Sequence, residues 1–180
     1  MTTRINAIQN EEATGKAKEL LDAVQNKLGM TPNLMKTFAN SPAVLEGYLA
    51  LNESLGSTLS ATLREQLAIT VANSNSCHYC VSAHTAIGKM SGLTETELSA
   101  ARNADSVDPR AKTAMIFARR VLAERGSVTD DDINTVRKAG YGDKEITEIV
   151  AHVALNVLTN YFNNVARTEI DFPEIALAAG

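Results

Sequence analysis

The sequence predicts an all-α protein, a single antiparallel helical bundle spanning residues 1–180. Apolar residues recur at three- and four-residue intervals along most of the chain, the spacing that places them on one face of an α-helix. Capping residues and glycines that begin and end helices are frequent, and no segment alternates polar and apolar residues as a half-buried strand does. A chain of 180 residues is also long enough to bury a sizeable core in one domain.

In the first half of the chain, capping residues and glycines divide the apolar periodicity into five expected helices. Thr31 and Ser41 each precede a proline suited to the first turn of a helix, so each is expected to cap the helix that follows. Ser60 is the expected cap of the fourth helix, and two cysteines open the fifth. The helices are expected at residues 13–28, 32–39, 42–55, 61–72 and 77–90.

Four further helices are expected in the second half. Thr94 and Glu97 have the spacing of a capping box, in which each side chain accepts a hydrogen bond from the other residue's backbone. The tail from Asp171 onward is expected to pack loosely or to dock on a neighbouring molecule. The helices are expected at residues 94–103, 109–125, 130–139 and 144–166, with Asp108, Thr129 and Asp143 capping the last three.

The chain matches itself weakly at an offset of 83 residues. Two interpretations are open: an internal duplication of a helical unit, or the periodicity that unrelated amphipathic helices share. The cysteine positions, Cys77 and Cys80, correspond to Asn160 and Asn163 in the second segment. If the duplication is real, only the first unit carries thiols.

Charge and composition exclude several classes of protein. The formal net charge is −4 and the 17 Lys and Arg residues are scattered, so no basic surface for nucleic acid is expected. The first residues lack the apolar core of a signal peptide, and the longest apolar stretch, Ile149–Val157, is far too short to span a bilayer. The protein is therefore expected to be soluble and cytoplasmic, without a membrane partner.

Chemistry is expected at Cys77 and Cys80, which are separated by two residues. A secreted disulfide scaffold of this length would contain more cysteines. At the start of a helix, unpaired N–H groups and the helix dipole lower the pKa of a thiol and raise its reactivity. His84 follows Cys80 by four residues, so it shares a helical face with the thiols and is placed to accept or deliver a proton. This spacing favours a redox dithiol with its own base.

Glu65 is the candidate partner of His84. It is expected on the preceding helix in a stripe of small apolar residues, where an unpaired carboxylate would be unfavourable. A contact with Glu65 would orient the imidazole and raise its basicity. The catalytic candidates are therefore Cys77, Cys80, His84 and Glu65.

Metal binding and simple packing are the other interpretations of the cysteine pair. Structural zinc needs about four converging ligands, typically from two separate segments. The chain has no second CxxC, His78 points away from the face of the thiols, and His152 is the only distant histidine, so no metal site is predicted. A thioredoxin-like fold is disfavoured because no strand precedes the motif. Buried cysteines also serve simply as small apolar residues.

A group of asparagines follows helical spacing near the end of the last expected helix, beside Tyr161 and Phe162. They are expected either to form a hydrogen-bonded helix interface or to line a polar pocket against the cysteine helix, and the interface is the favoured interpretation. The group consists of Asn156, Asn160, Asn163 and Asn164.

The combination of Glu65, Cys77, Cys80 and His84 in an all-helical chain resembles the AhpD-like alkylhydroperoxidases, a branch of the carboxymuconolactone decarboxylase superfamily. The core that bears this motif covers residues 59–92. The helical layout and the closing segment ALNVLTNYFNNVARTEIDFP resemble the peroxidase-related members along most of the chain. The resemblance implies one AhpD-like all-helical domain.

The resemblance also implies a peroxidase that needs no cofactor. Cys80 would attack the hydroperoxide and become a sulfenic acid, Cys77 would condense with it to a disulfide, and an external dithiol would restore both thiols. Glu65 and His84 would relay protons to and from the sulfur. Family members are usually trimers or hexamers, so a homo-oligomer is expected.

One position departs from the best-known alkylhydroperoxidase, which has a histidine immediately before its second cysteine. Here that position is Tyr79 and the histidine is His78, so both are secondary candidates, and the Tyr79 hydroxyl would substitute in the relay. The alternative functions are a thiol-disulfide oxidoreductase or redox sensor acting on a protein partner, a cofactor-free decarboxylase of the same superfamily, and a helical assembly without catalysis.

Overall fold

Nine α-helices and no β-strand make up the regular structure of residues 2–178, the part of the chain that this computed structural model describes. The predicted all-α fold class is therefore confirmed. The helices are α1 (Gly15–Leu28), α2 (Asn33–Phe38), α3 (Pro42–Leu55), α4 (Ala61–Ser74), α5 (His78–Met90), α6 (Glu95–Ala101), α7 (Pro109–Ala123), α8 (Asp130–Lys138) and α9 (Asp143–Ala166).

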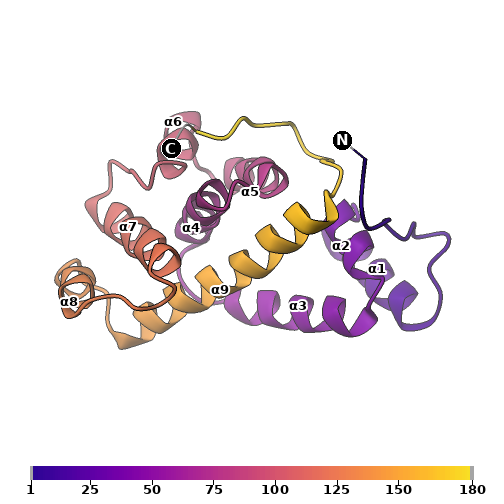
Figure 1. Cartoon of the computed structure of the whole chain (residues 1–180), viewed down its shortest axis with the longest axis horizontal. Helices are drawn as coiled ribbons and strands as arrows, with labels where there is room; N and C mark the ends of the chain where they lie inside the picture. The colour runs from indigo at the N-terminus through magenta and orange to yellow at the C-terminus, as the bar shows by residue number, and fades with distance from the viewer. Residues whose placement is uncertain (1, 179–180) are drawn as a thin grey trace.

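The long helix α9 crosses the molecule and connects its two sides (Figure 1). Its first half lies beside α7, and its second half lies beside α2 and α3. Helix α4 packs against α5, α6, α7 and α9, which makes it the central helix of the fold. No helix among the described residues has the length and apolar character needed to cross a membrane.

Two groups of buried side chains form the core, and α4 contributes to both. The first group lies between α4, α6, α7, α8 and α9 and includes Leu67, Met115 and Ile149. The second lies between α1, α2, α3 and α5 and includes Leu21, Phe38 and both cysteines. Helix α4 serves both groups because it is buried on every side from Gln66 to Ala72. The cysteines are thus part of a packed core rather than of a surface loop.

Most predicted caps are confirmed. The hydroxyl of Ser60 accepts a hydrogen bond from the backbone of Leu63, and Thr94 forms the expected capping box with Glu97. Asp108 and Thr129 also accept backbone hydrogen bonds at the starts of α7 and α8.

Three predicted caps are wrong. The hydroxyl of Thr31 contacts Asn10 and Gln25 instead of capping α2, and Ser41 precedes α3 without a side-chain cap. Asp143 is the first residue of α9 rather than its cap. Its carboxylate accepts a hydrogen bond from Arg137, 2.7 Å away, while Glu145 Oε2 accepts the backbone N–H of Gly142.

The C-terminal tail packs on its own chain, which differs from the expected loose or intermolecular arrangement. It runs back from the end of α9 over α5 toward α6 (Figure 1). Ile175 N–H donates to Ser82 Oγ (3.0 Å), and Ala178 N–H donates to the side chain of Asn73 (2.9 Å). The tail therefore covers the side of α5 that carries Ser82.

The match at an offset of 83 residues does not extend to the cysteines in three dimensions. Residues 61–74 form α4 and their counterparts, 144–157, form the first part of α9. Beyond them, the first segment turns sharply into α5 while α9 continues as one helix of 24 residues. The two segments thus share helical geometry only before the cysteine turn.

Candidate functional site

The turn between α4 and α5 places the cysteines at the start of a helix. Ser76 has φ +54°, and the backbone N–H groups of Ser76 and Cys77 donate to the carbonyls of Asn73 (3.0 Å) and Ala72 (2.9 Å). This pair of bonds is a Schellman motif, which ends α4 and reverses the chain. Cys77 is then the N-cap of α5, and its Sγ accepts a hydrogen bond from the backbone of Cys80 (3.3 Å).

The two cysteines are joined as a disulfide in the structure. Their Cα atoms are 5.3 Å apart, which is the separation expected for residues on the first turn of a helix that share such a bond. Both residues are buried, with exposed fractions of 0% for Cys77 and 2% for Cys80. The sequence motif therefore corresponds to a bonded pair that is shielded from bulk solvent.

Glu65 and His84 are in direct contact, as the sequence predicted. His84 Nδ1, on α5, lies 2.8 Å from Glu65 Oε2, on α4. The side chain of His84 is 25% exposed and that of Glu65 is 15% exposed. The carboxylate thus fixes the orientation of the imidazole at one nitrogen and leaves Nε2 free for another partner.

A cavity of about 290 Å³ connects the imidazole with one of the sulfurs. Cys80, His84 and Glu65 all line it, whereas Cys77 does not. Its remaining wall is mostly apolar and includes Leu34, Met35, Tyr48, Ile87 and Phe172. The cavity therefore distinguishes the two cysteines, because a ligand within it meets only Cys80.

Tyr79 lines the same cavity but its hydroxyl is engaged elsewhere, and His78 lies apart from the site. The Tyr79 hydroxyl accepts a hydrogen bond from the backbone N–H of Leu34 (3.1 Å), and its ring meets Phe172 edge to face. Burial raises the pKa of Tyr79 far above its usual value, so the hydroxyl stays protonated. His78 is exposed and lines a separate open groove. The structure thus assigns Tyr79 to the contact between α5 and α2.

The asparagines of α9 lie mainly at an interface within the chain, and one of them reaches the cysteines. The side chain of Asn75, in the turn before Cys77, donates to Asn160 Oδ1 (3.0 Å), and Asn164 donates to the Asn75 carbonyl (2.9 Å). Asn163 Nδ2 lies 3.2 Å from Cys80 Sγ. The favoured interface is present, and Asn163 also lines the cavity.

Tyr48 and Phe172 are site residues that were not expected from the sequence, and Asn163 was expected only as one of four asparagines that form an interface or line a pocket. Burial, followed by the charge of Glu65, raises the pKa of Tyr48 to about 12, so its hydroxyl stays protonated beside the carboxylate. Tyr48 and Phe172 carried no usable signal, because each reads as an ordinary apolar position. Asn163 had one: it is the counterpart of Cys80 at the offset of 83 residues.

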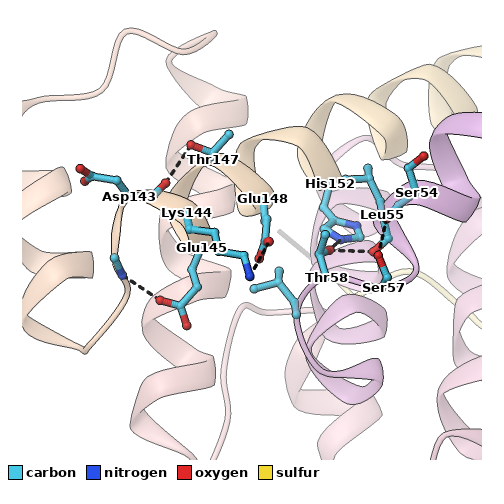
Figure 2. A network of polar contacts seen from close by, with 12 residues as sticks. Ser54, Leu55, Ser57, Thr58, Asp143, Lys144, Glu145, Thr147, Glu148 and His152 are labelled. Atoms are coloured by element: carbon cyan, nitrogen blue, oxygen red, sulfur yellow. Dashed lines mark hydrogen bonds and ion pairs between the residues drawn. The ribbon is translucent and has the colours of Figure 1, made fainter.

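His152 lines a second cavity, of about 60 Å³, which Glu65 and His84 also line. Figure 2 shows its ring against Thr58, in the turn after α3. The Thr58 hydroxyl donates to the carbonyl of Leu55 (2.7 Å) and so accepts from His152 Nε2–H (2.9 Å). Burial, followed by the charge of Arg64, lowers the pKa of His152, which is therefore neutral near pH 7.

Among residues 2–178, no three His, Cys, Asp or Glu side chains are arranged so that they could bind a metal ion. The site thus consists of two sulfurs, one imidazole, one carboxylate and the amide of Asn163, within a largely apolar wall.

Solved structures share this fold at low sequence identity. The AhpD-core, peroxidase-related protein from Ralstonia eutropha JMP134 superposes with a TM-score of 0.83 at 23% identity, covering 94% of this chain and 92% of that one. A peroxidase-related protein from Silicibacter sp. TM1040 gives 0.77 at 23% identity, with coverages of 96% and 93%. The debrominase Bmp8, in complex with 2,3,4-tribromopyrrole, gives 0.79 at 17% identity, with coverages of 95% and 93%.

Sequence comparison finds one family that matches part of the chain. No curated protein is significantly similar to the chain. The sequence model of the carboxymuconolactone decarboxylase family matches residues 42–124, the segment from α3 to the end of α7 that contains Glu65, both cysteines and His84. Residues 42–124 therefore carry the sequence pattern of the carboxymuconolactone decarboxylase family, and the chain shares its fold with the AhpD-core and peroxidase-related structures.

Proposed function

We propose that the protein is a thiol-dependent peroxidase, which reduces hydroperoxides through the Cys77–Cys80 pair. The observation that carries the proposal is the cavity of about 290 Å³, where Cys80 meets His84 and Glu65 and from which Cys77 is excluded. A peroxidase of this type needs one sulfur that meets the substrate and one that waits beside it. The cavity supports Cys80 in the first role and Cys77 in the second.

In the first step, the Cys80 thiolate attacks the terminal oxygen of the hydroperoxide. The new S–O bond forms as the O–O bond breaks, so sulfur is oxidised to a sulfenic acid and the peroxide is reduced to an alcohol. The leaving alkoxide needs a proton, which the imidazolium of His84 supplies. Glu65 holds His84 Nδ1 at 2.8 Å, so the proton is delivered from Nε2.

In the second step, the thiolate of Cys77 attacks the sulfenic sulfur and water leaves, which gives the disulfide that the structure contains. The residues are one helical turn apart, so the disulfide closes without rearrangement of α5. An external dithiol then reduces the pair by two electrons and is itself oxidised. The full cycle converts a hydroperoxide and a dithiol to an alcohol, water and a disulfide.

The proposal is preferred to disulfide exchange with a protein partner because both sulfurs are buried. A thiol carried on a folded protein must reach sulfur in line with the disulfide, whereas a small hydroperoxide, and a small dithiol that completes the cycle, reach Cys80 through the cavity. Two rival activities are debromination, the activity of the similarly folded Bmp8, and lactone decarboxylation. They are tested by giving the same purified protein a bromopyrrole or a lactone in place of the hydroperoxide.

The experiment follows hydroperoxide consumption by the purified protein with an organic hydroperoxide and a dithiol. Cys80→Ser is expected to abolish turnover. Without the dithiol, Cys77→Ser is expected to consume one equivalent and to keep a sulfenic acid on Cys80, detected by mass spectrometry, where the wild type forms the disulfide. This pair of variants forms a matched control, because each keeps one thiol. Turnover by Cys80→Ser, or activity only toward a bromopyrrole or a lactone, would overturn the proposal.

We also propose that copies of the chain assemble into a homo-oligomer through the outer face of α9. Val150, Leu158, Tyr161 and Val165 follow one another at helical spacing on this face, and all four are exposed. No charged residue occurs between Ile149 and Ala166. An uncharged apolar stripe of this length is typical of a contact surface.

A further inference from the structure

We propose that Asn163 is a catalytic residue of the peroxidase, which binds the Cys80 sulfur through Nδ2 and receives the O–H of the bound hydroperoxide at Oδ1. The inference rests on the proposed function and extends it to a helix outside the segment that carries the motif. Asn163 is 83 residues from Cys80 in the chain and belongs to α9.

The side chain of Asn163 is buried in contact with Cys80. Its exposed fraction is 3%, and its Nδ2 lies 3.2 Å from Cys80 Sγ. Its Oδ1 is buried and accepts no hydrogen bond from any described residue. A buried amide oxygen without a donor is unfavourable, so its retention beside a reactive sulfur indicates a ligand that completes it.

The position of Asn163 is held by its neighbours. One helical turn earlier, Asn160 accepts a hydrogen bond from Asn75, the residue two before Cys77. This contact ties α9 to the turn that presents the cysteines. The amide of Asn163 therefore has a fixed orientation toward Cys80 and loses little conformational entropy when substrate binds.

The Nδ2 contact favours the ionised form of Cys80. A disulfide or a neutral thiol is a weak acceptor, whereas a thiolate accepts the same N–H strongly. A hydrogen bond that stabilises the charged form lowers the pKa of the group. Asn163 therefore raises the fraction of Cys80 that is ready to attack.

The Oδ1 atom suits both the substrate and the product of the first step. The terminal oxygen of a hydroperoxide carries a proton, and it comes to rest against Cys80 Sγ as the S–O bond forms. The resulting sulfenic acid presents a sulfur acceptor next to an O–H donor. A carboxamide presents the complementary donor and acceptor side by side, so one residue holds both atoms.

The test measures the thiol pKa of Cys80 in a Cys77→Ser background, from the pH dependence of thiolate absorbance. Asn163→Ala is expected to raise this pKa by about one unit or more, since the hydrogen bond to the charged form is lost. Asn163→Asp is nearly isosteric and places a negative charge beside the sulfur, so it is expected to raise the pKa further. The control Asn134→Ala changes an exposed amide on α8 and is expected to leave the pKa unchanged.

The same variants with Cys77 intact are then assayed with hydroperoxide, where Asn163→Ala is expected to lower kcat/KM by about 100-fold, consistent with one preorganised donor. An unchanged Cys80 pKa in folded Asn163→Ala and Asn163→Asp overturns the inference. If Asn163→Ala does not fold, Asn163→Asp decides alone. Absence of turnover in the unmodified protein would refute the peroxidase, while the thiol pKa would still report on Asn163.

Discussion

At the scale of single residues, the site separates two cysteines that the sequence presents as equals. Both are buried and belong to the first turn of α5. Cys77 is enclosed by the turn that ends α4, whereas Cys80 faces the cavity and the amide of Asn163. Their surroundings therefore differ more than their positions in the motif suggest, and the roles proposed for them follow from this difference.

Glu65→Gln is expected to lower the peroxidase kcat/KM by about 100-fold, because the neutral amide holds His84 without stabilising its imidazolium. The melting temperature is expected to change little, since the replacement has the same shape. Steady-state kinetics with an organic hydroperoxide provide the measurement. Glu46→Gln, on the exposed side of α3, is the matched control and should retain full activity. Equal rates for the two variants would show that the carboxylate of Glu65 is dispensable.

His152 is expected to make the protein less stable in acid. Its pKa is lowered in the folded state by burial and by Arg64, so below the unfolded-state value of about 6.5 the unfolded chain binds the proton more readily. The free energy of unfolding should therefore decrease as the pH falls from 7 to 5, with a slope of at most about 1.4 kcal/mol per pH unit from this residue.

Urea unfolding at a series of pH values for the wild type, His152→Gln and Thr58→Val tests this expectation. His152→Gln should remove the contribution of the imidazole to the slope. Thr58→Val loses the hydrogen bond to His152 but keeps the imidazole, so it should be less stable at every pH and retain the slope. An identical slope in the wild type and His152→Gln would contradict the assignment.

The contact between Glu65 and His84 could be predicted from the sequence because each residue lies on a face defined by helical spacing, and the two helices are consecutive. Phe172 could not, and Asn163 could be named only among four asparagines with two possible roles, because these residues reach Tyr79 and Cys80 from the tail and from α9. Helical periodicity shows which face of a helix is buried but not which distant helix covers it. A site assembled from remote segments is therefore recovered only in its local part.

At the scale of elements, the close packing of α6 and the loop before it against α5 depends on Gly88. A side chain at this position would approach Leu98 Cδ2 to 2.7 Å, Leu93 Cδ1 to 3.2 Å and Glu65 Cβ to 3.6 Å. Gly88 lies one turn beyond His84, and Glu65 on α4 is at ordinary van der Waals distance from a side chain placed there. The glycine thus allows α6 to approach the last turn of α5 beside the Glu65–His84 contact.

Gly88→Val is expected to destabilise the protein by about 1–3 kcal/mol through overpacking against Leu93 and Leu98. It should also lower peroxidase activity, because α5 must shift relative to Glu65. Chemical denaturation and steady-state kinetics measure the two effects. Gly47→Val is the control, since nothing lies within 4 Å of a side chain at that position of α3. Equal stability of the two variants would show that α5 accommodates the valine without displacement.

Helix boundaries were predictable to within a few residues because capping residues, prolines and glycines act locally. The wrong cap predictions arise from competing contacts with other parts of the chain. Thr31 and Asp143 have side chains that are suitable for capping, but each has a stronger partner: Gln25 and Asn10 for Thr31, and Arg137 for Asp143. At the start of α2, the carboxylate of Asp171 from the tail accepts the N–H of Asn33 (2.7 Å) in place of a local cap. Tertiary contacts therefore override capping preference where a charged group is near.

At the scale of the whole molecule, the sequence predicted one all-helical domain but not its division into two groups of core residues. Both groups are apolar and both follow helical spacing, so composition does not separate them. The separation arises because α4 is buried on all sides and α9 runs across both groups (Figure 1). This central pair of helices carries two of the site residues, Glu65 on α4 and Asn163 on α9.

Leu158→Glu is expected to convert the proposed homo-oligomer to monomers. The substitution places a charge in the middle of the exposed stripe of α9, where assembly would bury it without a partner. Size-exclusion chromatography with light scattering measures the mass. Val107→Glu is the matched control, because Val107 is 88% exposed and lies outside α9, so it should leave the mass unchanged. A monomeric wild type, or an unchanged mass for Leu158→Glu, would show that the stripe does not join copies of the chain. The two variants thus distinguish loss of this contact from a general effect of added charge.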